Sequence, residues 1–279
     1  AIHDDLRCGL GKPVHLRICT EPGAVDLVAE SLAARPDVRS VFAITGDTGL
    51  WCELIAGGAD PLLRLHEILV REFPAMPGMR AAESEVVLRT FATVADWHAP
   101  LLPDAAVAEL RGCAIQPLAV LPDREELGAA ERAVADLLIR DGRMSYTQLA
   151  EELGASVPTV RRKVSWLLER RLVRLRAEVE PALLGLQVEV QVGLQVRPAA
   201  IDAVGRELAG HPGVRYCAAM AGRHDLLLEV CLPHESDLYD FVGSLHDVSD
   251  ADMVFVTRAY KRGHLRKDGR MTLSPAPRA

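Results

Sequence analysis

The sequence predicts an α+β protein in which two copies of one βαββαβ domain flank a helix-turn-helix. Residues 9–45 match residues 185–221 without a gap at an offset of 176 residues, and the segment between the copies is basic and helical in pattern. Identical pairs include Gly9/Gly185, Pro22/Pro198, Asp26/Asp202, Pro36/Pro212, Arg39/Arg215, Gly46/Gly222, Leu50/Leu226 and Glu53/Glu229. A period this long is not that of a solenoid, so each copy is expected to have its own core and to pair with the other as a pseudo-dimer.

Composition is that of a globular protein with two or three domains: 279 residues, 49% apolar and 25% charged. Apolar runs are too short to span a membrane, and we expect no cleavable signal. The six cysteines include no CxxC pair and are expected to be small buried hydrophobes, with disulfides or a zinc site as the alternative. His224, His234 and His246 lack metal-ligand spacing, and no catalytic triad or phosphate-binding glycine loop occurs, so we expect no metal, no cofactor and no enzyme active site.

Both copies have alternating apolar runs separated by amphipathic segments. The first copy, residues 9–95, has strands near Val14, Val41, Leu50 and Val86 and helices near Val25 and Leu65. The second copy, residues 185–265, has strands at 187–196, 214–221, 226–231 and 252–260 and helices at 198–209 and 235–247. Each copy should form a four-stranded antiparallel sheet with two helices on one face, and the other copy should cover the bare face. The connector, residues 96–128, contains four prolines and a short helix predicted at 104–111, and it is expected to run over the surface.

Charge is concentrated in the central segment. The net charge of −7 argues against nucleic acid, but residues 129–176 have ten Arg and Lys against six Asp and Glu. That excess is typical of a phosphate-binding surface, although a solvated basic helix face has the same composition.

Three helices are predicted within this segment. The first ends at Asp141-Gly142, the second begins after Ser145, and the third begins with Ser156 as N-cap and Pro158 in its first turn. Val160, Val164, Leu167 and Leu168 form the buried stripe of the third helix, and residues 172–177 alternate as a short wing strand. In a helix-turn-helix the second of the two helices joined by the turn enters the major groove of duplex DNA, and here that helix is the third of the three predicted. The residues expected at the DNA are Ser145, Ser156, Thr159, Arg161, Arg162, Lys163, Arg174 and Arg176. A basic three-helix module that binds another partner is the alternative.

The stretch DGRMSYTQLAEELGASVPTVRRKVSWLLERRLVRLRAEVEPALLG, residues 141–185, resembles the DNA-binding domain of the Lrp/AsnC family of feast/famine regulators. The two repeats resemble that family's effector domain, called RAM, a ferredoxin-like βαββαβ unit. The resemblance implies a sequence-specific DNA-binding transcriptional regulator, with its winged helix-turn-helix at 129–180. It also implies an amino acid or related small metabolite as effector, RAM–RAM pairing within the chain or in a homo-oligomer, and a cytoplasmic, nucleoid-associated location. Arg171 stands where the family usually has a glycine, so the third helix is expected to end differently here.

One loop of each repeat is the candidate effector site. Gly222, Arg223, His224 and Asp225 precede Leu226 and are similar to the family's G-x-x-D-L signature, which borders the amino-acid site. Glycine lets main-chain N–H groups approach a carboxylate, and Asp225 can accept a hydrogen bond from an ammonium group. The first repeat has Gly46, Asp47 and Thr48 in the same loop, but Gly49 replaces the aspartate, so binding there should be weaker. A glycine-containing hairpin with a solvated aspartate is the alternative.

Two other functions remain open. Sirohaem decarboxylases resemble the same layout, also as tandem fusions, but they tend to have a Gly-x-x-His-Asn-Tyr run where this chain has Gly-Arg-His-Asp-Leu. A ligand-binding oligomer that no longer uses DNA would need the face at residues 161–163 to be covered.

The two ends of the chain give two further expectations. Ala1 aligns with Ala177, directly after the wing, so we expect the natural protein to have a first winged helix-turn-helix before this residue. The basic residues from Arg258 to Arg270 either contact DNA or lie in a solvated tail at 266–279.

Overall fold

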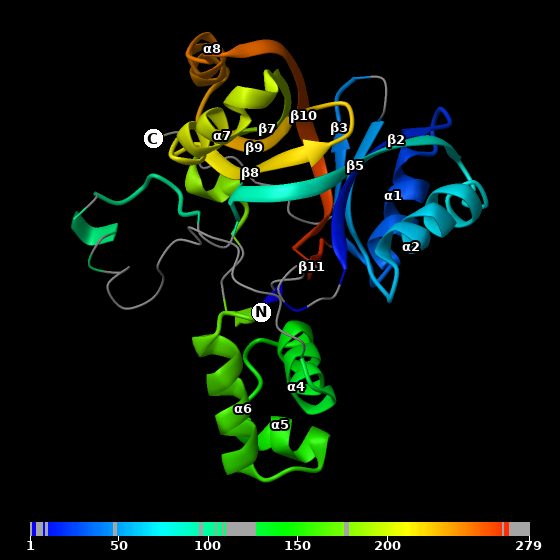
Figure 1. Cartoon of the computed structure of the whole chain (residues 1–279), viewed down its shortest axis with the longest axis vertical. Coiled ribbons are helices and arrows are strands. Elements are labelled where there is room, and N and C mark those ends of the chain that lie inside the picture. Colours follow the sequence, from blue (N-terminus) through cyan, green and yellow to red (C-terminus); the bar gives the residue numbers. More distant parts are fainter. Residues whose placement is uncertain are drawn as a thin grey trace, which may run out of the picture.

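The computed structural model describes residues 2–3, 8, 11–46, 49–94, 97–103, 105–107, 109, 127–175, 179–263 and 265–267. The strands of the two repeats form one body, and the helix-turn-helix stands apart from it (Figure 1). Within the described part of the chain, no helix has the length and apolar character needed to cross a membrane.

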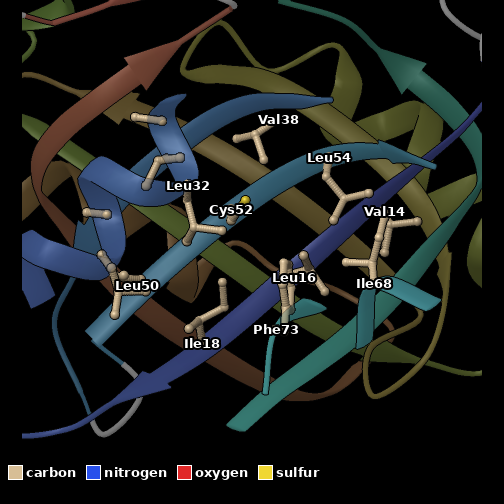
Figure 2. Packing of buried hydrophobic residues seen from close by; sticks show 14 of the residues in the cluster. Val14, Leu16, Ile18, Leu32, Val38, Leu50, Cys52, Leu54, Ile68 and Phe73 are labelled. Carbon is tan, nitrogen blue, oxygen red and sulfur yellow. The ribbon is translucent and has the colours of Figure 1, made fainter. Parts of the chain in front are cut away.

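The first repeat forms a βαββαβ unit. Its elements are β2 (Lys12–Thr20), α1 (Val25–Ala34), β3 (Val38–Ile44), β4 (Gly49–Ala56), α2 (Pro61–Glu67), which continues into a π-helical turn (Ile68–Glu72), and β5 (Met79–Ala92). Alternate residues of β2 (Val14, Leu16, Ile18) are fully buried against the helices, and Figure 2 shows them facing Leu32 and Phe73. The helices therefore cover one face of this sheet and leave the other face to the second repeat.

The second repeat has the same element order and a separate core. Its elements are β7 (Val188–Val196), a 3-10 turn (Pro198–Ala200), α7 (Ile201–Ala209), β8 (Val214–Ala221), β9 (Leu226–Leu232), α8 (Glu235–Gly243), β10 (Val248–Arg262) and β11 (Leu265–Arg266). The helix predicted at 235–247 was too long, and the last strand begins four residues earlier than predicted. Asp247 adopts a left-handed conformation (φ 58°) there, which aspartate tolerates better than most residues, and the chain turns into β10.

The two sheets join at their edges. β5 pairs with β8, β10 pairs with β3, and β7 also pairs with β10, so eight strands follow one another in a closed ring. Closure is possible because β5 and β10, with 14 and 15 residues, pair with their own repeat along one stretch and with the other repeat along another. The second repeat therefore covers the bare face of the first, as predicted, but by a continuous sheet that leaves few free edges.

Large apolar side chains fill the space between the sheets. The inward cluster is contributed by strands of both repeats: Phe42, Ile44, Trp51, Val87, Ala218, Met220, Leu227 and Val254. Trp51 stacks on Phe42 with 5.5 Å between ring centroids, and the guanidinium of Arg262 lies 4.7 Å from the centre of the Phe42 ring.

Three helices form the domain between the repeats. These are α4 (Ala129–Arg140), α5 (Tyr146–Leu153) and α6 (Val157–Glu169), followed by the two-residue strand β6 (Val173–Arg174). The predicted wing is shorter than expected, and it pairs with β1 (Ile2–His3) from the start of the chain. Cys8 is buried in the helical core, with Sγ 3.4 Å from the Leu172 carbonyl oxygen. Residues that precede the first repeat thus complete the helix-turn-helix domain.

Other predictions apply to segments that are only partly described. Residues 105–107 and 109 of the predicted connector helix are helical, and the rest of that helix lies outside the described residues. Of the cysteines, Cys8, Cys52, Cys217 and Cys231 are buried, Cys19 is half-buried, and none of these five is in a disulfide; Cys113 is outside the described residues.

The basic residues near the C-terminal end belong to the fold as far as residue 267. Arg258 pairs with Asp26 (3.3 Å), Arg266 with Glu30 (2.9 Å), and Lys261 donates to the Arg35 carbonyl oxygen (2.8 Å). The expectation of a solvated tail from residue 266 was wrong for Arg266 and Lys267, because Arg266 pairs with Glu30 of the first repeat and Lys267 with Glu180, which lies between the helix-turn-helix and β7.

Candidate functional site

Hydroxyl side chains set the starts of α5 and α6. Ser145 and Gln148 form a capping box, in which the Ser145 Oγ accepts from the Gln148 N–H (3.3 Å). Gly154 turns the chain in a left-handed conformation, and the Ser156 Oγ then accepts from the Thr159 N–H (3.4 Å) and lies 2.9 Å from the Thr159 Oγ1. These three residues were expected at the DNA, and in the structure Ser145 caps α5 while Ser156 and Thr159 form the cap of α6.

The first turns of α6 present two arginines to solvent. Val160, Val164 and Leu167 are buried against α4 and α5, as the spacing predicts, and Arg161 and Arg162 are exposed. Their guanidinium groups stand on the half of the helix that enters the major groove in proteins of this architecture.

Lys163 differs from the prediction. Its side chain is half-buried, and Nζ bonds to the carboxylate of Glu131 in the first turn of α4, which holds the pKa of that carboxyl below its usual value. The lysine therefore joins two helices of its own domain instead of extending the basic face. The partner lies 32 residues away, and the sequence pattern gave no sign of it.

The end of α6 also differs from the prediction. The Leu172 N–H donates to the Leu167 carbonyl (2.9 Å) and the Arg171 N–H donates to the Leu168 carbonyl (3.0 Å), which is a Schellman motif. Arg171 therefore occupies the left-handed position (φ 56°) despite not being glycine. In the wing, Arg174 lies on β6, and Arg176 is outside the described residues.

The loop at residues 222–225 lies against the first repeat. A Cβ at Gly222 would stand 2.7 Å from Cγ and 3.0 Å from Cβ of Glu85 on β5, so the glycine is required by this close approach. Gly222 is absent from the residues with positive φ, so its close approach to Glu85, and not a left-handed backbone, accounts for the glycine. In the other repeat Gly46 does have a positive φ (92°), and Asp47 and Thr48 lie outside the described residues.

Asp225 and His224 both have protein partners. The Asp225 Oδ2 accepts from the Val196 N–H (2.8 Å), so one carboxylate oxygen closes the end of β7. His224 is buried; its N–H donates to Glu85 Oε1 (2.8 Å), and its Nδ1 lies 3.1 and 3.2 Å from the two Glu85 oxygens. Burial alone would raise the pKa of Glu85, but these hydrogen bonds outweigh it and hold the pKa below its usual value.

Residues from both repeats extend this contact into a cluster of charges, which we call the seam cluster: Arg17, Glu83 and Glu85 of the first repeat and Arg223, His224 and Asp252 of the second. Three of its side chains approach one oxygen atom, Asp252 Oδ2: Arg17 Nη1 at 2.5 Å, His224 Nε2 at 3.6 Å and Arg223 Nη2 at 3.9 Å. Arg223 Nη1 lies 3.7 Å from Glu83 Oε2. Four of these residues were not predicted, although Arg17, Glu83 and Glu85 occupy alternate positions of apolar strands, where a charge on a buried face is unusual.

A second charged network lies further along β10. Arg262 binds Glu189 through two hydrogen bonds (2.6 and 2.8 Å) and also approaches Glu229 (3.4 Å), which pairs with Arg215 (3.0 Å). Arg39 and Glu53, at the corresponding positions of the first repeat, pair at 3.3 Å, so both copies place the same ion pair on the inner face. Arg262 also approaches Glu180 (3.5 Å), in the segment between the helix-turn-helix and β7, and thereby ties that segment to the sheet.

Comparison with known proteins identifies the family. Residues 187–265 match the Lrp/AsnC ligand binding domain and residues 131–174 match a winged helix-turn-helix DNA-binding domain. The leucine-responsive regulatory protein of Rhizobium meliloti (strain 1021) is 32% identical over 123 residues, which are 43% of this chain and 79% of that protein. The chain belongs to the Lrp/AsnC family.

This chain, as a member of the Lrp/AsnC family, is an HTH-type transcriptional regulator. A further relative is also named an HTH-type transcriptional regulator. An uncharacterised HTH-type transcriptional regulator of Pyrococcus horikoshii is 27% identical over 146 residues, which are 50% of this chain and 92% of that protein. Among solved structures, the siroheme decarboxylase NirDL aligns with 96% of this chain and 77% of its own length, with a TM-score of 0.60 and 17% identity. At that identity the likeness concerns the fold alone.

Proposed function

We propose that this Lrp/AsnC-family chain reads a specific operator through α6 and responds to an amino acid or related small metabolite bound by its repeats. The observation that carries the proposal is the exposure of Arg161 and Arg162 on the first turns of a capped second helix in a helix-turn-helix. An arginine fork can donate two parallel hydrogen bonds to guanine O6 and N7, so this placement suits base readout.

Both repeats take part in this proposal. The first has the βαββαβ order of the second, and we assign it the role of a second RAM domain, so that one chain corresponds to a dimer of single-repeat relatives. The same proposal includes three further points. The repeats associate further with those of other chains, Gly49 weakens effector binding by the loop of the first repeat, and the chain acts in the cytoplasm at the nucleoid.

A mobility-shift assay with the DNA upstream of the chain's own gene tests it. We expect a shifted band that survives competitor DNA of unrelated sequence, and a change of affinity on addition of one or more amino acids. If competitor DNA of unrelated sequence abolishes the shifted band, the result would contradict sequence-specific binding to an operator. An absorption spectrum after incubation with sirohaem tests the enzyme alternative, because a bound tetrapyrrole gives a strong visible band, and on our proposal no such complex forms.

A further inference from the structure

The N-terminal end of α6 carries an exposed apolar side chain. Val157, the first residue of the helix, is 40% exposed. Within residues 127–175 only two other large apolar side chains are exposed, Tyr146 at the first position of α5 and Leu175 after the wing. Other residues of α6 fill the core of the domain, and Val157 is not one of them. Its side chain is therefore free to contact a partner.

The hydroxyl groups at the same end of α6 are engaged in the helix cap. The Ser156 Oγ accepts from the Thr159 N–H (3.4 Å) and lies 2.9 Å from the Thr159 Oγ1. Pro158, which follows Val157 and is also exposed, has no N–H group to donate. The side chains of Val157 and Pro158 can therefore recognise a base only by apolar contact.

Arg161 stands one helical turn after Val157, on the same side of α6. Residues four apart on a helix are neighbours, and their axial separation of about 6 Å corresponds to about two base-pair steps of about 3.4 Å. In a helix-turn-helix the N-terminal residues of the second helix contact base edges in the major groove. Val157 therefore continues the interface proposed for Arg161, and the two side chains reach bases that lie close to each other.

We propose that Val157 is a specificity-determining residue that reads the C5-methyl group of a thymine, within about two base pairs of the guanine that Arg161 reads. Thymine alone among the four bases presents an apolar group in the major groove, so it is the base that an apolar side chain can select. This inference rests on the proposed reading of an operator by α6, and it adds a base that no hydrogen bond selects. The operator then contains a guanine chosen by an arginine and a nearby thymine chosen by burial of its methyl group.

Selection of duplexes from a randomised DNA library, followed by sequencing, tests the two residues together. The unaltered chain should select a motif in which a thymine at one fixed position lies within about two base pairs of a guanine. Val157→Ala should lose the preference for that thymine and keep the guanine, and the retained guanine shows that the variant still folds and binds DNA. Arg161→Ala should lose the guanine and keep the thymine. The matched control is Val70→Ala, the same substitution at a 56% exposed valine of the first repeat, and it should select the motif of the unaltered chain.

Replacement of the selected thymine by uracil removes only the methyl group from the duplex. Fluorescence anisotropy should show affinity about three- to fivefold weaker for the unaltered chain, which is the effect of one buried methyl group, and unchanged affinity for Val157→Ala. An equal loss in both proteins would overturn the proposal, because another residue would then read the methyl group. A preference for thymine that survives Val157→Ala would overturn it as well.

The same selection separates a failure of this inference from a failure of the proposed function. A selected motif whose guanine depends on Arg161, but in which no thymine depends on Val157, rejects methyl readout alone. If the unaltered chain enriches no sequence from the library, the reading of an operator by α6 is rejected, and methyl readout is rejected with it.

Discussion

At the scale of single residues, His15 shows how the closed sheet changes acid–base chemistry. The ring is buried between Trp51 and Tyr216, with Nε2 3.2 Å from the Tyr216 hydroxyl, and burial lowers the pKa of His15 to about 3. The folded chain keeps this ring neutral, whereas the unfolded chain binds a proton near pH 6.5. Between these two values the unfolded state binds more protons, so acidification through this range removes stability.

His15→Gln should therefore flatten the pH dependence of stability. Glutamine already occupies the corresponding position of the second repeat, Gln191, so the residue type suits this inner face. Between pH 6.5 and about pH 5 the unaltered chain should lose about 1 to 2 kcal/mol relative to the variant in free energy of unfolding, measured by urea titration. Parallel pH curves for the two proteins would contradict a neutral, buried His15.

Arg171 is a second residue whose conformation costs free energy in the folded chain. A side chain in the left-handed cap of α6 is disfavoured by roughly 1 kcal/mol relative to glycine. Arg171→Gly should therefore be more stable than Arg171→Ala by about 1 kcal/mol, and the comparison cancels whatever the arginine side chain contributes. Thermal unfolding followed at the helical domain measures the difference. Equal stability of the two variants would mean that the backbone conformation carries no cost.

At the scale of elements, α6 should dominate DNA affinity. Arg161→Ala and Arg162→Ala are each expected to weaken operator binding by about 1 to 3 kcal/mol if the arginine reads a base, or to reduce the salt dependence if it contacts only phosphate. Fluorescence anisotropy over a range of salt concentrations measures both quantities. Arg206→Ala, an exposed arginine of α7 in the second repeat, is the matched control. Unchanged affinity and salt slope in both α6 variants would remove this helix from the interface.

Lys163→Met separates packing from DNA contact on the same helix. Because Lys163 bonds to Glu131, we expect a change in the stability of the helical domain with little change in the salt slope. A reduction of the slope as large as that of the arginine variants would show that the lysine reaches phosphate in the complex.

At the scale of the whole molecule, the closed ring of strands should make the two repeats unfold together. Phe42 is 1% exposed between the sheets, in contact with strands of both repeats. Phe42→Ala should cost about 3 to 5 kcal/mol and should lower hydrogen-exchange protection in β4 and in β9 alike. The control, Leu149→Ala in the core of the helix-turn-helix, should lower protection in α4 to α6 and leave β9 unchanged. Loss confined to β4 in Phe42→Ala would mean that the repeats fold independently.

The sequence by itself determined the element order, the boundaries of three strands of the second repeat to within a residue, the capping residues of α5 and α6, and the exposed pair Arg161 and Arg162. These features depend on periodicity and on contacts within a few residues, which a sequence pattern records directly. The duplication was read from identities such as Arg39/Arg215 and Glu53/Glu229, and the structure then showed that these residues form the same ion pair in both copies.

Tertiary structure alone decided what the charged residues do. Lys163 bonds to Glu131, His224 to Glu85 and Arg17 to Asp252, and these partners are 32, 139 and 235 residues apart in the chain. The pairs of His224 and Arg17 depend on how β5 and β10 cross from one repeat to the other, and no local pattern encodes that crossing. A charge moved out of water must find a partner. Closing the sheet therefore holds His224, which the sequence had placed at the ligand, against Glu85, and the packing of α6 on α4 brings Lys163, which the sequence had placed at the DNA, to Glu131.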